Sequence, residues 1–158
     1  MHKIPYISPE TLKANPRNAR THSKKQIRQI ADSIQTYGFT VPLLIDDDTL
    51  IMAGHGRLEA AKLLRLRKVP VIVLDGLSEA KKRALLLADN KIAENSGWDR
   101  EVLAVELPEL ADLLIEEEFD ISITGFEPVE IDQIVTDFEE DSADPADAMD
   151  SAWEAEQR

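Results

Sequence analysis

Four consecutive residues, Gly54-His55-Gly56-Arg57, follow an apolar run and precede a helical pattern. A glycine-rich turn between a strand and a helix leaves backbone N–H groups unpaired at the positive end of the helix dipole, where phosphate binds. Glycine lets a ligand approach the backbone closely, and Arg57 can add a bidentate contact to phosphate oxygens. Tight strand-to-helix turns also need glycine for steric reasons, so on these residues alone a phosphate site and a structural turn both remain open.

The histidine of this turn has three possible roles, as a general base, a metal ligand or a phosphate contact. His22 is the only other histidine that could plausibly bind a metal together with His55. The chain has no His-x-x-x-His spacing, so a zinc site is not expected. We interpret His55 as a contact to phosphate or substrate at the mouth of a cleft.

Two groups of carboxylates could hold a divalent cation. Asp89 is followed by Asn90, and Mg²⁺ prefers one or two carboxylates together with phosphate oxygens and water. The alternative is that both residues are polar positions on the exposed face of a helix. Asp46-Asp47-Asp48 lies between two apolar runs, and we interpret it as an exposed turn because the three side chains need not converge.

The elements that must position these groups follow from apolar periodicity and turn residues. We expect a strand at 3–7, a turn at 8–12, a loop at 15–22, a helix from Ser23 to a glycine cap at Gly38, a hairpin of 41–45 and 50–53, a helix at 57–66, a strand at 69–74 and a helix at 78–92. This order predicts an α/β (α+β) fold, a small mixed sheet with packed helices. Leu85, Ala88 and Ile92 are expected on the inner face of the last helix.

The remaining chain is expected to be an acidic helical extension. The pattern after Asp99 is helical with Pro108 interrupting it, residues 119–126 break it, and residues 128–138 form one more amphipathic helix. We therefore divide the chain into a domain at 1–100, an acidic helical extension at 101–138 and a disordered acidic tail or linker at 139–158.

Charge is divided between the two halves of the chain. The net charge is −13 over 158 residues, but residues 1–100 contain a surplus of Lys and Arg, whereas Arg158 is the only basic residue after position 100. Basic clusters near 17–28, 57–68 and 81–83 favour a polyanionic partner, although solvated helix faces would explain each cluster singly. The chain has no cysteine, which excludes thiol chemistry, and no apolar run long enough to span a bilayer. We expect a cytoplasmic protein without a membrane partner.

Three motifs in order resemble the ParB/sulfiredoxin superfamily, and specifically the ParB N-terminal domain over residues 4 to about 100. They are Asn15-Pro16-Arg17-Asn18-Ala19-Arg20 with the helix after it, Ala53-Gly54-His55-Gly56-Arg57-Leu58-Glu59, and Leu87-Ala88-Asp89-Asn90-Lys91. The resemblance implies a sulfiredoxin-like fold and a bound nucleoside triphosphate, CTP or ATP, with Mg²⁺.

Carried over by position, the resemblance implies roles for individual residues. Gly54, His55, Gly56 and Arg57 would cradle phosphate, Arg20 would assist, and Asp89 with Asn90 would lie near the metal. Partition proteins have Glu and Arg where this chain has His55 and Gly56, so one phosphate-neutralising charge is missing. Sulfiredoxin chemistry is excluded because it needs a cysteine. Residues 101–158 lack the basic recognition helix of a DNA reader, so sequence-specific DNA binding by this chain alone is not expected.

Three functions remain open on the sequence. The first is a nucleotide-binding module associated with DNA, resembling domains at the front of prophage DNA-modification proteins, in which residues 127–150 would link to a methyltransferase. The second is an enzyme of the same fold, either an NTPase, a metal-dependent ParB-like nuclease or a small-molecule kinase, with Asp89, His55 and Glu59 as catalytic candidates and Glu94 as a helper. The third is an interaction module with an acidic regulatory tail. DNA or a DNA-acting protein is the expected partner, and a homodimer is possible.

Overall fold

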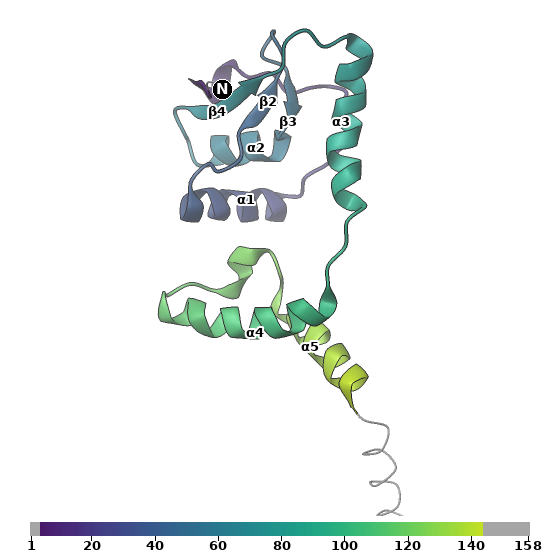
Figure 1. Ribbon diagram of the computed structural model, residues 1–158. Helices are drawn as coiled ribbons and strands as arrows, with labels where there is room; N and C mark the ends of the chain where they lie inside the picture. The colour runs from purple at the N-terminus through teal and green to yellow at the C-terminus, as the bar shows by residue number, and fades with distance from the viewer. Residues whose placement is uncertain (1–3, 144–158) are drawn as a thin grey trace, which may run out of the picture. The chain divides into compact units, whose positions relative to one another are not determined.

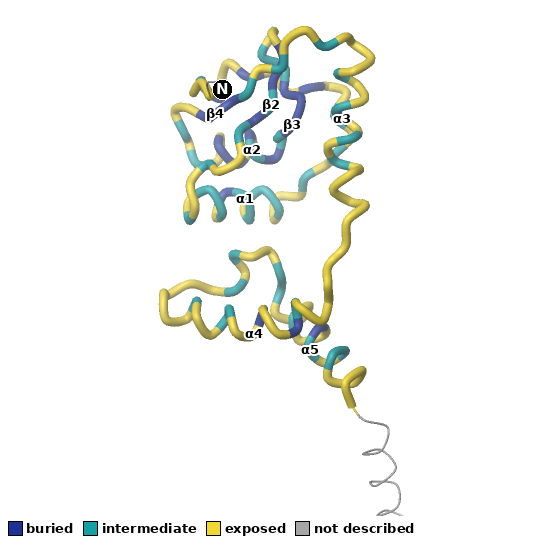
Figure 2. Tube along the Cα trace, in the orientation of Figure 1, coloured by how far each residue is buried: buried dark blue, intermediate teal, exposed yellow. Residues whose placement is uncertain are grey.

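The computed structural model describes residues 4–143 and divides the chain into two compact units, Met1–Gly97 and Trp98–Arg158 (Figure 1). Each unit has its own core of buried apolar side chains (Figure 2). The elements of the first unit, in chain order, are β1 (Tyr6–Ile7), the 3-10 helix η1 (Pro9–Thr11), α1 (Lys24–Tyr37), β2 (Leu43–Ile45), β3 (Ile51–Ala53), α2 (His55–Leu63), β4 (Val69–Val73) and α3 (Glu79–Glu94).

The first unit is built on a four-stranded mixed sheet with the strand order β1-β4-β2-β3. The strands β2 and β4 run parallel, with Leu43 opposite Val71, while β1 and β3 are antiparallel to their neighbours. The near-continuous apolar run of β4 fits its interior place in the sheet, where its first three residues, 69–71, are buried. Val69 and Val71 are fully buried. The predicted mixed α/β fold is therefore confirmed.

Helices cover this sheet in an arrangement that the local sequence explains. In the first unit, α1 and α2 lie together on one side of the sheet and α3 lies beside β3 (Figure 1). The side chain of Ser23 accepts a hydrogen bond from the Gln26 N–H (3.1 Å), and Gly38 ends α1 at φ +80°, as the capping pattern predicted. The core residues come from both layers and are Leu12, Leu43, Ile45, Ile51, Leu58, Ala61, Val69 and Val71.

The acidic turn between β2 and β3 is held by one buried carboxylate. Asp46 is only 4% exposed, and its Oδ1 accepts hydrogen bonds from the N–H groups of Asp48 (3.0 Å) and Leu50 (2.9 Å). Its Oδ2 accepts from Lys82 Nζ of α3 at 2.9 Å. Asp47 and Asp48 are exposed. The expectation of an exposed turn thus fits Asp47 and Asp48 but was wrong for Asp46, because its carboxylate is buried to accept these hydrogen bonds.

The first unit differs from the sequence prediction in several element bounds, for example α2 at His55–Leu63 in place of 57–66, and in the burial of one residue. The strand expected at 3–7 is only Tyr6–Ile7, with Lys3 outside the described residues. Ile92 was expected inside, and this was wrong, since it is 69% exposed. The reason is that α3 extends beyond the end of β3, so that only its earlier turns, at Leu86, have a sheet to cover (Figure 1).

The second unit consists of α4 (Arg100–Glu116), the 3-10 helix η2 (Ile121–Thr124) and α5 (Pro128–Ser142). Its small core joins Ala104 and Leu107 of α4 to Ile134 of α5. The expectation that Pro108 interrupts the helix was wrong, because α4 continues through it. Packing of the adjacent residues on α5 outweighs the one N–H that a proline cannot donate.

The C-terminal boundary falls later than expected, because α5 reaches Ser142 and therefore includes the start of the predicted tail at 139–158. Residues 144–158 lie outside the described part of the chain. Across residues 4–143, no helix combines the length and the apolar character that crossing a bilayer would require.

Candidate functional site

The turn from β3 into α2 exposes backbone donors at a helix N-terminus. Gly54 is the N-cap, at φ +101°, and no side chain caps the helix. The first helical hydrogen bond runs from the Leu58 N–H to the Gly54 carbonyl (2.9 Å), so the N–H groups of residues 55–57 have no partner within the helix. A Cβ at Gly54 would lie 2.5 Å from Leu43 Cδ2, so the glycine is also sterically required. The same turn therefore needs glycine at position 54 for steric reasons and also offers unpaired N–H donors at residues 55–57.

A pocket of about 320 Å³ opens at this helix end, and we call it the α2 pocket. Three separate segments supply its polar lining: Asn18, Arg20 and His22 from the loop before α1, residues 54–57 from the turn, and Asp89 with Asn90 from α3. The structure therefore brings together every residue that the sequence analysis assigned to phosphate or magnesium. Glu59 is absent from the lining and lies exposed on α2, 3.5 Å from Lys62 Nζ.

Arg57 lines the α2 pocket with a positively charged guanidinium that is available to bind an anion. Its side chain is half-buried, and burial lowers the pKa of its guanidinium, which the charge of Asp89 partly restores. Within residues 4–143 the guanidinium makes no hydrogen bond and no ion pair, although Asp89, which also lines the pocket, acts on it through its charge. A half-buried charge without a contact partner favours the binding of an anion.

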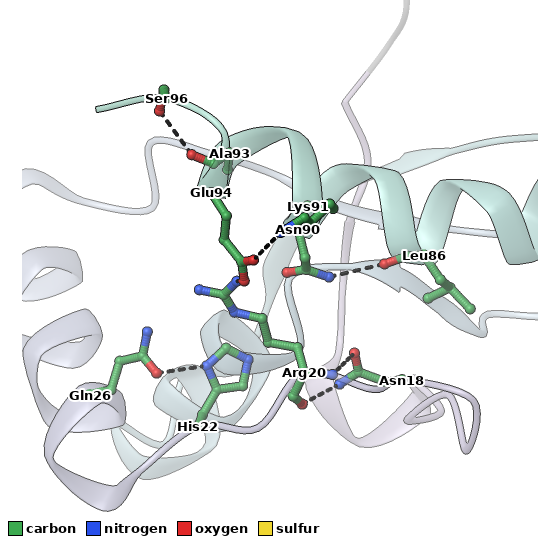
Figure 3. Close-up of polar contacts among 10 residues, drawn as sticks. All are labelled: Asn18, Arg20, His22, Gln26, Leu86, Asn90, Lys91, Ala93, Glu94 and Ser96. Carbon is green, nitrogen blue, oxygen red and sulfur yellow. Dashed lines mark hydrogen bonds and ion pairs between the residues drawn. The ribbon is translucent and has the colours of Figure 1, made fainter. Parts of the chain in front are cut away.

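Arg20, the second predicted phosphate contact, is already engaged. Its Nη1 donates to Glu94 Oε1 at 2.8 Å, and Lys91 Nζ lies 3.4 Å from the other oxygen of the same carboxylate (Figure 3). The backbone of Arg20 exchanges two hydrogen bonds with the Asn18 side chain. The ion pair ties the loop before α1 to the end of α3, and a phosphate would have to share Arg20 with Glu94.

His55 makes a hydrogen bond to the loop before α1 that was not predicted from the sequence. Its Nε2 accepts a hydrogen bond from the backbone N–H of Asn15 at 3.1 Å, so Nδ1 carries the proton of the neutral ring. Burial lowers the pKa of His55, the nearby His22 lowers it further, and Glu59 opposes both. His55 thus holds the loop that begins at Asn15 against the first turn of α2.

His22 is a pocket residue that the sequence analysis did not assign. A Cβ at Gly56 would lie 3.0 Å from His22 Cε1 and 3.0 Å from Ile30 Cδ1, so the imidazole packs directly on the glycine. The sequence offered one link, since His22 was the only histidine considered as a metal partner of His55, but it did not predict the packing of His22 on Gly56.

The residues that line the α2 pocket could hold a magnesium ion that takes most of its ligands from phosphate. Asn90 donates through Nδ2 to the Leu86 carbonyl (3.0 Å), which leaves its amide oxygen without a hydrogen bond among the described residues (Figure 3). Asp89 lines the same pocket. One carboxylate and one amide oxygen match a cation that takes most of its ligands from phosphate and water. Among the described residues there is no cluster of three or more His, Asp or Glu side chains that could hold a metal by themselves.

Two family descriptions match the chain. The ParB N-terminal domain matches residues 1–91, and the ParB-methyltransferase HTH domain matches residues 101–157. The second match was not predicted from the sequence, because residues 101–157 lack the basic charge expected of a recognition helix.

Curated relatives share the first unit. The ParB-like nuclease domain-containing protein YnaK of Escherichia coli (strain K12) is 47% identical over 81 residues, which are 51% of this chain and 93% of YnaK. The probable chromosome-partitioning protein ParB of Treponema pallidum is 36% identical over 97 residues, covering 58% of this chain. The chain spans only 30% of the length of that partition protein.

Solved structures share the fold. C-terminally truncated ParB of Caulobacter crescentus, complexed with CTP-gamma-S, aligns with a TM-score of 0.66 at 21% identity, covering 84% of this chain and 77% of that one. A pNOB8-like ParB N-domain aligns with a TM-score of 0.50 at 18% identity, covering 89% and 62%.

Proposed function

The chain belongs to the ParB family through its N-terminal domain, and from that premise we propose that its first unit binds a nucleoside triphosphate in the α2 pocket. The observation that carries the proposal is the convergence of free backbone donors at residues 55–57 with the partnerless guanidinium of Arg57 in one cavity. Together they form an anion site at the positive end of a helix.

The nucleotide that we favour is CTP with Mg²⁺. A partition protein of the same fold was solved with CTP-gamma-S, and this supports a triphosphate ligand for the corresponding pocket here. We assign the polyphosphate to Gly54, His55, Gly56 and Arg57, and the cation to Asp89 and Asn90. The metal would neutralise phosphate charge that the chain's own cations do not reach.

Calorimetric titration of the full chain with CTP, ATP and GTP, each with Mg²⁺, tests this proposal. We expect Arg57→Ala to weaken binding at least tenfold, since hydrogen bonds to a charged group contribute about 1.5–3 kcal/mol. Arg28→Ala is the matched control, because Arg28 is exposed on α1 and does not line the pocket. No binding by the parent chain, or equal losses in both variants, would refute the assignment.

We further propose that the nucleotide-bound chain acts in association with DNA, alongside a DNA methyltransferase. The description of the family matched by residues 101–157 supports such a partner. The second unit itself offers little to the phosphate backbone, since Arg100 is paired with Asp137 at 2.6 Å and residues 101–157 contain no Lys or Arg. DNA contacts would then come from the first unit, where Lys24 and Arg28 are exposed one turn apart on α1.

The DNA proposal predicts a measurable salt dependence. Binding of the full chain to duplex DNA, with and without CTP, should weaken as salt increases, because it rests on release of counterions. The double variant Lys24→Glu/Arg28→Glu should bind more weakly than Lys24→Gln/Arg28→Gln at every salt concentration. Light scattering of the same samples tests the proposed homodimer. A DNA affinity that changes neither with the salt concentration nor with the charges at positions 24 and 28 would contradict this proposal.

A further inference from the structure

We propose that His22 is a ligand-binding residue of the α2 pocket, donating Nε2–H to a phosphate oxygen in its imidazolium form, so that the nucleotide binds together with one proton. This inference deepens the proposed nucleotide function and rests on it. It places a cationic hydrogen-bond donor next to Gly56.

The first step is the position of the ring. His22 lines the α2 pocket and occupies the space next to Gly56, where its Cε1 and Nδ1 lie 3.0 and 3.1 Å from an added Cβ. A side chain at position 56 would have to displace this imidazole. The glycine and the histidine are therefore complementary, and the cation at this point of the pocket comes from the loop before α1.

The second step is the hydrogen bonding of the ring. His22 Nδ1 lies 3.1 Å from Gln26 Oε1, and because an amide oxygen can only accept, Nδ1 is the donor. Nε2 is on the other side of the ring from Gln26 and has no hydrogen bond within residues 4–143 (Figure 3). Nε2 can donate to a phosphate oxygen only when it is protonated, and with Nδ1–H already present the ring is then a cation.

The third step separates His22 from the other charged groups of the pocket. His55 is kept neutral, because its Nε2 accepts the Asn15 N–H and burial lowers its pKa. Arg20, Arg57 and Asp89 also face the cavity, and side chains of these types ordinarily keep their charge between pH 6 and 8. An imidazole ordinarily changes charge within that interval. His22 is thus the lining group that can gain a proton when a polyphosphate enters.

The test measures proton uptake during binding. CTP and inorganic tripolyphosphate are titrated into the full chain in two buffers of different ionisation enthalpy, at several values between pH 6.5 and 8. Protonation of the phosphates themselves is common to all variants and cancels in the comparison. We expect the parent chain to take up between about half a proton and one proton more than His22→Gln. As the pH rises from 6.5 to 8, the affinity of the parent chain should fall roughly tenfold more than that of His22→Gln.

A matched variant distinguishes the two histidines. His55→Gln keeps an acceptor for the Asn15 N–H but cannot titrate, so proton uptake should persist in it even where affinity is reduced. In the double variant His22→Ala/Gly56→Arg a fixed charge replaces the titratable one, and binding without extra proton uptake is expected. Thermal melts of all variants confirm folding before titration.

The outcomes are separable. Uptake that persists in His22→Gln and disappears in His55→Gln would overturn the assignment of the proton to His22. Equal uptake in all three chains would overturn it as well. Either result would leave the nucleotide site standing if Arg57→Ala still weakens binding at least tenfold. A parent chain that binds neither CTP nor tripolyphosphate at any pH would refute the site and this inference together.

Discussion

Removal of the buried carboxylate at Asp46 should destabilise the first unit by about 3 kcal/mol. Asp46→Ala leaves the N–H groups of Asp48 and Leu50 and the ammonium of Lys82 without their acceptor. Hydrogen bonds to a charged acceptor contribute about 1.5–3 kcal/mol each, and the exposed side of the turn lets water replace part of that sum. Asp46→Asn keeps one acceptor oxygen and should lose about half as much.

The pH dependence of this effect has a defined direction. Burial raises the pKa of Asp46, but hydrogen bonds from Lys82, Leu50 and Asp48 outweigh it, so the folded pKa lies below the ordinary value of 3.8. A carboxyl with a depressed folded pKa contributes its stability above 3.8 and loses it as pH falls through the folded value. The difference between the parent and Asp46→Asn should therefore be constant from pH 5 to 8 and shrink only below about pH 4.

Urea unfolding followed by circular dichroism measures both effects. The midpoint for Asp46→Ala is expected roughly 2 M below that of the parent, at unchanged slope. Asp47→Asn is the control, since this neighbour is exposed and should change stability by less than about 0.5 kcal/mol. Asp46 variants as stable as the control at pH 7, or a difference that disappears between pH 5 and 7, would show that the turn is not held in this way.

Three further outcomes follow from the structure. Gly54→Ala should lose about 2–4 kcal/mol in urea unfolding, because of its positive φ and the contact of a new Cβ with Leu43; stability within 1 kcal/mol of the parent would contradict this. Glu94→Gln removes the exposed ion pair with Arg20 and should change stability by less than about 0.5 kcal/mol in the same assay. Pro108→Ala restores a helical donor in α4 and should stabilise the second unit by about 1 kcal/mol, measured by thermal unfolding followed through tryptophan fluorescence; a lower midpoint would argue that the proline shapes the helix.

Local signals in the sequence were sufficient for the architecture of the first unit. The caps at Ser23 and Gly38 and the hairpin turn depend on residues within a few positions of one another, and each lies where it was predicted. The ParB resemblance, carried by three motifs in order, is confirmed by the family match over residues 1–91. All three segments contribute residues to the α2 pocket.

What could not be predicted depends on contacts between distant residues. The exposure of Ile92 follows from where the sheet ends, and the engagement of Arg20 follows from the approach of Glu94, 74 positions later in the chain. His22 gained its place only through the packing of α1 on α2.

The helix-turn-helix match was missed for a different physical reason. Net charge describes which partners a surface attracts, whereas the fold follows from apolar spacing. In the second unit that spacing places Ala104, Leu107 and Ile134 in one core while the surface is acidic. The absence of a basic recognition helix therefore says nothing about the architecture of the second unit.

The strand order has a consequence for how the first unit forms. The strand β1 pairs with β4, so Tyr6 has no partner in the sheet until Pro70, 64 positions later in the chain, has come beside it. The hairpin of β2 and β3, by contrast, closes through a turn of a few residues and can form within microseconds. Because pairing across long stretches of chain is slow, the N-terminal strand should be the last to join the sheet and the first to leave it under force or denaturant.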